Sequence, residues 1–109
     1  MHILAIETSC DETAVALIEA KGGLRNPQFK ILKNLVASQV KIHQPYGGVV
    51  PNLAKREHSR NLPILLKKIF KIPIFGSPTS KHYRQMASPD FLNIDLIVVT
   101  VGPGLEPCL

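Results

Sequence analysis

The side chains best suited to chemistry gather between Glu7 and Thr13, in the segment E-T-S-C-D-E-T. Turn amides and short hydroxyls bind oxyanions such as phosphate, but neighbouring carboxylates repel an anion unless a divalent cation bridges the two. One interpretation is therefore a loop that binds the phosphates of a metal–nucleotide complex. The alternative is a solvent-exposed hairpin turn, because Asp, Ser and Thr bond readily to nearby backbone. The segment has no glycine and matches neither the Walker nor the dinucleotide fingerprint.

Two short apolar runs, Ile3–Ile6 and Ala14–Ile18, flank this polar tip. Neither run alternates with polar residues, so both are predicted to be strands buried on both faces. A turn cluster at Lys21–Gln28 carries two glycines, an asparagine and a proline. Phe29–Ser38 is predicted to follow as a third strand and to complete an antiparallel three-stranded unit.

A second candidate region lies in Gln39–Val50, which contains H-Q-P-Y-G-G-V-V. Gly47 and Gly48 allow the backbone to turn sharply or a ligand to approach closely. His43 and Tyr46 add a polar and an aromatic edge. The alternative is an ordinary glycine-rich connection with a packed tyrosine.

From Pro51 the pattern becomes helical, because proline suits the first turn and apolar residues then recur at three- and four-residue steps. Pro63 removes a hydrogen bond in mid-helix, so we expect a kink or two helices meeting near residues 61–62. His58 lies on the apolar stripe, where a hydrogen-bonded core histidine is commoner than a ligand. The apolar stripe comprises Ala54, His58, Leu62, Leu65 and Ile69, and a basic face that could contact phosphates comprises Arg56, Arg60, Lys67 and Lys71.

The last predicted element is Asp95–Val101, a run typical of a strand buried on both faces, followed at once by G-P-G-L. A strand that ends in Gly-x-Gly is a place where backbone approaches a bound group. The chain stops at Leu109 without the helix expected next, which predicts the first part of a longer protein. Residues 73–91 show no periodicity and are predicted to be a flexible insertion or a binding loop.

Composition sets further bounds. A chain of 109 residues fits one domain, and its net charge of +5 suggests either a polyanionic partner such as RNA or a solvated basic face. The sequence has no apolar run long enough for a membrane span and no signal-peptide pattern, which predicts a cytoplasmic location without a membrane partner. Its two cysteines are far apart, which argues against a disulfide framework. The acidic neighbours of Cys10 disfavour a reactive thiolate.

Three motifs together resemble the TsaD family of tRNA adenosine threonylcarbamoyltransferases. They are I-E-T-S-C-D-E-T at Ile6–Thr13, S-Q-V-K-I-H-x-P-Y-G-G-V-V-P-N-L-A-x-R-E-H at Ser38–His58, and T-V-G-P-G-L at Thr100–Leu105. The resemblance implies an α/β fold of the actin-like ATPase (ribonuclease H-like) class. Residues 1–109 would form the N-terminal part of its first domain: an antiparallel hairpin unit, a helix and a further strand.

The resemblance also implies an activity. The family transfers threonylcarbamoyl from threonylcarbamoyl-AMP to N6 of the adenosine 3′ of the anticodon, in tRNAs reading codons that begin with A. It implies a divalent metal, with iron suspected, whose ligands lie beyond residue 109, so no metal ligand is expected within this chain and the chain alone is expected to be inactive. Threonylcarbamoyl-AMP or ATP would be the nucleotide ligand. The implied partners are tRNA and the other subunits of the modification complex, a paralogous scaffold and a small ATPase in bacteria.

The resemblance assigns three groups of site residues. Asp11 and Glu12 are the candidate catalytic residues. Phosphate or nucleotide binding is assigned to Thr8, Ser9, Cys10, Gly102 and Gly104, and a surface facing substrate or tRNA to His43, Tyr46, Gly47, Gly48, Arg56 and His58.

Three competing interpretations of the function remain. They are another carbamoyltransferase or kinase of the same fold, a non-catalytic scaffold paralogue, and a basic RNA-binding module.

Overall fold

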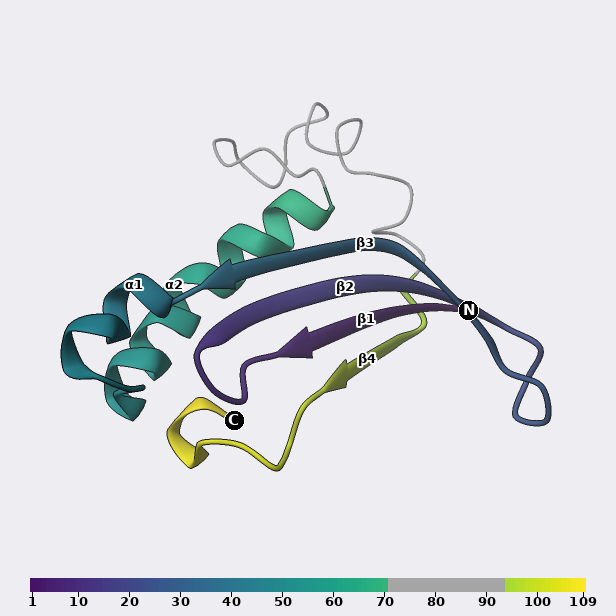
Figure 1. The fold of residues 1–109 in the computed structure, drawn as a ribbon. Coiled ribbons are helices and arrows are strands. Elements are labelled where there is room, and N and C mark those ends of the chain that lie inside the picture. Colours follow the sequence, from purple (N-terminus) through teal and green to yellow (C-terminus); the bar gives the residue numbers. More distant parts are fainter. Residues whose placement is uncertain (71–93) are drawn as a thin grey trace.

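A four-stranded mixed sheet forms the centre of the protein, which a computed structural model describes over residues 1–70 and 94–109. The strand order is β3-β2-β1-β4 (Figure 1). β1 pairs antiparallel with β2 and β2 antiparallel with β3, whereas β4 runs parallel to β1. The predicted three-stranded antiparallel unit is therefore confirmed. The strands are β1 (His2–Glu7), β2 (Glu12–Lys21), β3 (Gln28–Ser38) and β4 (Leu96–Val99).

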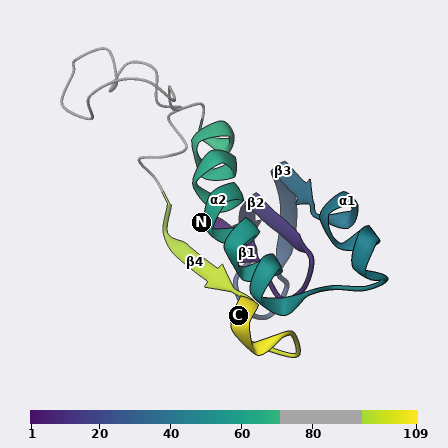
Figure 2. The same cartoon turned by 90° about the vertical axis from the view of Figure 1, so that its left-hand side faces the viewer.

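One long helix covers a single face of this sheet over β2 and β3 (Figure 2). It is α2 (Pro51–Ile69), and it begins with proline in its first turn as predicted. Two short helical turns that the sequence analysis missed precede it: α1 (Val40–His43) and η1 (Gln44–Tyr46). A last turn, η3 (Glu106–Cys108), contacts α2.

The core lies between α2 and the sheet. Alternate residues of β2 point toward the helix, and Leu17 is fully buried beside its partner Leu4 of β1. The α2 stripe supplies the other half, with Leu65 and Ile69 buried and Leu62 packed against them. The periodicity of apolar residues thus predicted the correct helix face.

α2 continues through Pro63 as one helix, so of the two alternatives expected there, a kink or two separate helices, the second is wrong. Proline cannot donate the backbone hydrogen bond that a helix requires at this position. Burial of Leu65 and Ile69 on the following turn stabilises the helix beyond it. Lys33 of β3 also donates its Nζ to the carbonyl oxygen of Ile69 at 2.8 Å and so fastens the end of the helix to the sheet.

Burial on both faces was predicted for the apolar strands and is wrong for β4 and β2. All four residues of β4 are exposed, with Ile97 at 60%, because α2 packs over β2 and β3 and not over this edge. On β2 only the helix-facing residues are buried. Ala14 and Ala16, on the opposite face, line a surface hollow of about 320 Å³ together with Val98 of β4.

The α/β arrangement matches the expected incomplete first subdomain of an actin-like fold: hairpin unit, helix, then a further strand. The predicted insertion at 73–91 lies outside the described residues. Within the ranges that the structure describes, no helix is both long and apolar enough to span a membrane.

Candidate functional site

The acidic tip, residues 7–12, comprises the last residue of β1, the connection 8–11 and the first residue of β2 (Figure 1). The segment after β4 lies against it. Thr8 Oγ1 donates to the carbonyl oxygen of Cys108 at 2.7 Å, and the amide of Leu105 donates to the carbonyl oxygen of Ser9 at 2.7 Å. Two of the three sequence motifs, about 100 residues apart, therefore meet at one place.

Glu7, at the end of β1, is the best-bound carboxylate of the tip. The amide of Ser9 donates to its Oε1 at 2.7 Å, and the hydroxyls of Ser9 and Thr100 donate to its two oxygens. Burial works to raise the pKa of Glu7, but these hydrogen bonds outweigh it and lower the pKa below the ordinary 4.5. Sequence reasoning counted Glu7 in the tip without selecting it. An acid followed directly by two hydroxyl residues was the available signal.

Gly104 allows the segment after β4 to approach this tip. A Cβ at Gly104 would lie 2.7 Å from Ser9 Cβ and 2.8 Å from the Ser9 carbonyl oxygen. The close approach expected of this glycine is thus made to the protein's own tip. A Cβ at Gly102 would meet nothing, but its φ of +155° favours glycine. A nucleotide-binding role for either glycine stays a prediction.

The remaining tip residues are Cys10 and Asp11, and β2 then opens with Glu12. Burial, and then the nearby Asp11 carboxylate, raise the pKa of the Cys10 thiol above 9.0, which disfavours a nucleophilic thiolate at neutral pH. The side chain of Glu12 is exposed. Asp11 lines an open hollow of about 320 Å³ together with His43 and Gly48. One predicted catalytic residue and two predicted substrate-facing residues therefore share a surface.

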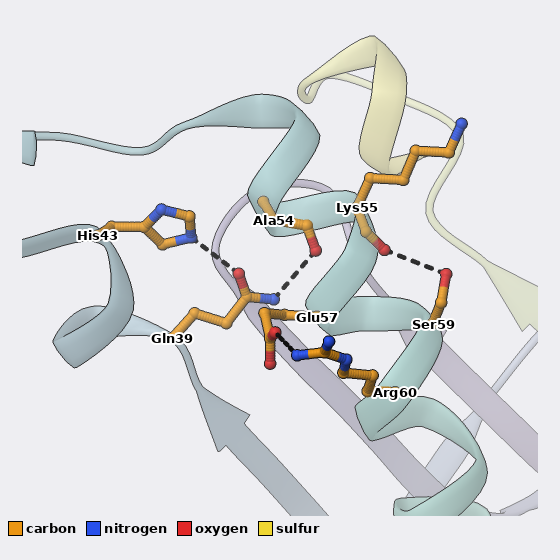
Figure 3. A network of polar contacts seen from close by, with 7 residues as sticks. All are labelled: Gln39, His43, Ala54, Lys55, Glu57, Ser59 and Arg60. Atoms are coloured by element: carbon orange, nitrogen blue, oxygen red, sulfur yellow. Dashed lines mark hydrogen bonds and ion pairs between the residues drawn. The ribbon is translucent and has the colours of Figure 1, made fainter.

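A buried polar network joins the tip to α1 and α2, and its centre is Gln39, a residue that sequence reasoning passed over. Figure 3 shows the contacts of Gln39 with His43 and Ala54. His43 Nε2 lies 2.8 Å from Gln39 Oε1, and the amide of Val50 donates to His43 Nδ1 at 3.1 Å. Gln39 Nε2 lies 3.4 Å from the carbonyl oxygen of Ala54 and 3.3 Å from His58 Nδ1. In the structure, the complete burial of this polar side chain identifies Gln39 as a functional candidate. The sequence alone does not predict that burial.

His58 completes this network on the side of the tip. Its Nε2 lies 2.9 Å from the carbonyl oxygen of Cys10, and its Nδ1 lies 2.7 Å from Thr13 Oγ1. The residue is 5% exposed, as expected of a hydrogen-bonded core histidine. Tyr46, Gly47 and Arg56 are exposed instead, so the predicted substrate-facing residues divide into buried and surface groups. Their contact with tRNA stays a prediction.

The described residues do not fit the metal that the family resemblance implies. No group of three or more His, Cys, Asp or Glu side chains is placed to hold an ion within 1–70 and 94–109. Each ring nitrogen of His43 and His58 already lies within hydrogen-bond distance of a protein group. Metal binding is therefore not proposed for any of these described residues.

Comparison with known proteins agrees with the sequence motifs. A model of the TsaD family, described as tRNA N6-adenosine threonylcarbamoyltransferase, matches residues 30–73. The enzyme of that name from Thermosipho africanus is 44% identical over 105 residues, which cover 96% of this chain and 25% of the relative. Those of Thermotoga neapolitana and Buchnera aphidicola are 39% and 43% identical over 109 residues, covering 100% of this chain and 26% of each relative.

The chain thus spans about a quarter of the length of the curated relatives that it matches. The matches at 39% and 43% identity extend over all 109 residues, so the matched region includes the tip, the glycine-rich segment and the strand β4. The chain is thus similar, over essentially its whole length, to proteins of the TsaD family.

Proposed function

We propose that the protein containing this chain transfers a threonylcarbamoyl group to N6 of an adenosine in tRNA. The observation that carries this proposal is the likeness to proteins named for that activity over 96% to 100% of the chain. In this proposal residues 1–109 form the N-terminal part of the first actin-like domain. The acceptor is the adenosine 3′ of the anticodon in tRNAs reading codons that begin with A.

The proposed donor is threonylcarbamoyl-AMP, a mixed anhydride whose adenylate is the leaving group. The acceptor is an exocyclic amine and a weak nucleophile. Such a reaction depends on positioning the amine and on stabilising charge on the leaving phosphate more than on a covalent intermediate. A divalent metal, iron in this proposal, would supply Lewis acidity from ligands beyond residue 109.

The acidic tip is the proposed phosphate-side wall of this site. Thr8, Ser9 and Cys10 bind the phosphate, and Asp11 or Glu12 orients water or substrate. The hydroxyl hydrogens of Thr8 and Ser9 are already donated to Cys108 and Glu7, so an anion must draw them away or use backbone amides instead. The tip is therefore a preformed turn whose donors exchange partners when an anion binds.

The exposed residues near the glycine-rich segment form the proposed tRNA-facing surface. Tyr46 is 68% exposed and offers an aromatic face on which a base can stack. Arg56 is exposed on α2 and can contact phosphate. The net charge of +5 and the tRNA-directed names of the relatives support tRNA as the partner of this surface. Partner subunits and a cytoplasmic location complete the proposal.

The decisive test measures threonylcarbamoyl transfer by the full-length protein with its partners, substrate tRNA, threonine, bicarbonate, ATP and the adenylate-forming enzyme. Asp11→Ala and Glu12→Ala are expected to lower kcat by roughly 100-fold or more, the usual effect of removing an orienting acid–base group. Glu19→Ala, an acid at the opposite end of β2, is the matched control and should keep the parent rate. Parent rates in both tip variants would refute the assignment, and a parent without any transfer activity would favour the scaffold paralogue.

A further inference from the structure

The buried network around Gln39 has a single consistent direction of hydrogen bonding. The amide of Val50 can only donate, so His43 Nδ1 accepts and His43 Nε2 carries the proton, which it donates to Gln39 Oε1. The amide nitrogen of Gln39 then faces His58 Nδ1, which must accept; the Thr13 hydroxyl, 2.7 Å from the same nitrogen, is its second donor. His58 Nε2 accordingly carries the proton and donates to the carbonyl oxygen of Cys10.

The two ends of this chain of bonds agree independently. The Cys10 carbonyl can only accept, which already requires a proton on His58 Nε2. The Val50 amide fixes His43 from the other end. Gln39, whose side chain has one accepting and one donating end, is the residue type that can join two rings of the same tautomer. A carboxylate or a second histidine in its place would break the sequence of donors and acceptors.

Gln39 also holds the tip directly. Its backbone amide donates to the carbonyl oxygen of Asp11 at 3.2 Å, beside the Cys10 carbonyl that His58 binds. It is fully buried, so it contacts neither solvent nor any molecule on the protein surface. Of two consecutive tip carbonyls, that of Asp11 is therefore bound by Gln39 directly and that of Cys10 by His58, whose Nδ1 lies 3.3 Å from Gln39 Nε2.

We propose that Gln39 is a positioning residue, which joins His43 and His58 as Nε2–H tautomers and, through His58 and its own backbone amide, holds the backbone of the acidic tip at Cys10 and Asp11. This inference rests on the proposed function only for its catalytic consequence. The arrangement of protons and the hold on the tip follow from the geometry alone. His43 lines the same hollow as Asp11, so the network also holds a second residue of that hollow.

The test is nitrogen-15 NMR of the histidine rings and backbone amides in the 109-residue chain. In the parent at pH 7.5, both His43 and His58 should be protonated at Nε2 and unprotonated at Nδ1. Gln39→Glu presents an acceptor to His58 Nδ1, so that nitrogen should become protonated and the amide signals around Asp11 should move. The matched control Gln28→Glu adds the same charge at the exposed start of β3 and should change neither ring.

An Nδ1–H form of His58 in the parent refutes the proposal without any variant. The proposal can therefore be tested even if Gln39→Glu does not fold. Unchanged His58 signals in a folded Gln39→Glu chain refute it as well. In the full-length transfer assay the same substitution should lower kcat and leave KM for tRNA unchanged, because Gln39 does not reach the surface. Correct tautomers together with no transfer by the parent would count against the proposed function and leave the positioning role intact.

Discussion

Replacing Gly104 with alanine tests whether the segment after β4 holds the acidic tip. The added Cβ would lie 2.7 Å from Ser9 Cβ and 2.8 Å from the Ser9 carbonyl oxygen, closer than carbon atoms approach in proteins. The Ser9 carbonyl belongs to the backbone and accepts a hydrogen bond from the Leu105 amide at 2.7 Å. It cannot move away from the added Cβ without losing that hydrogen bond. Overpacking of this kind costs about 1–3 kcal/mol.

Urea unfolding of the 109-residue chain, followed by circular dichroism, measures this cost. A loss of about 2 kcal/mol with an m value of about 2 kcal/mol/M lowers the unfolding midpoint by roughly 1 M. Because Ser9 donates to Glu7, the tip should also lose order, and the amide signals of Ser9 and Glu7 should shift.

Gly48→Ala is the matched control, because its Cβ would meet nothing within 4 Å and its backbone is not in the left-handed region. This variant should unfold at or slightly above the parent midpoint, since alanine reduces the entropy of the unfolded chain. Gly104→Ala and Gly48→Ala with equal midpoints would show that the contact between Gly104 and Ser9 does not exist in solution.

Three further predictions concern the core and the tip. Leu17→Ala, at a fully buried position, should lower the free energy of unfolding by about 2–5 kcal/mol in denaturant titrations. Glu7→Gln should destabilise the chain above pH 4.5, and the difference should vanish as the pH falls through the lowered pKa of the folded state, because only the ionised carboxylate gains from its donors; a difference independent of pH contradicts this. Iodoacetamide should alkylate Cys10 and Cys108 at pH 7 more slowly than a small free thiol, because the pKa of each thiol is raised.

The elements that sequence predicted correctly depend on local periodicity. The hairpin flanking the tip was predicted from two uninterrupted apolar runs, and the buried stripe of α2 from apolar residues that recur every three to four positions. Both are signals that short stretches of sequence carry by themselves. Periodicity could not show that α2 continues as one helix through Pro63. The packing that stabilises the helix after Pro63 is against a sheet formed by residues distant in sequence.

The exposure of β4 illustrates the opposite case. Its composition is that of a buried strand, but burial depends on where α2 lies on the sheet, and α2 covers β2 and β3. Likewise, the order of Glu7 and the two hydroxyl residues after it does not reveal that Thr100, 93 residues away, donates a hydrogen bond to the Glu7 carboxylate. Side-chain identity within a motif was readable from sequence, whereas the partner of each side chain was not.

The three motifs form one mechanical unit, because the acidic tip is held from two sides by the other two. From the helix side, His58 and Gln39 bind the carbonyl oxygens of Cys10 and Asp11. From the strand side, Leu105 and the close approach of Gly104 hold Ser9. A turn of short polar residues is intrinsically mobile, and alone it could not keep its amides aimed at an anion. Fixing three consecutive carbonyls from two directions, Ser9 to Asp11, is how the fold makes this turn rigid enough for the site proposed here.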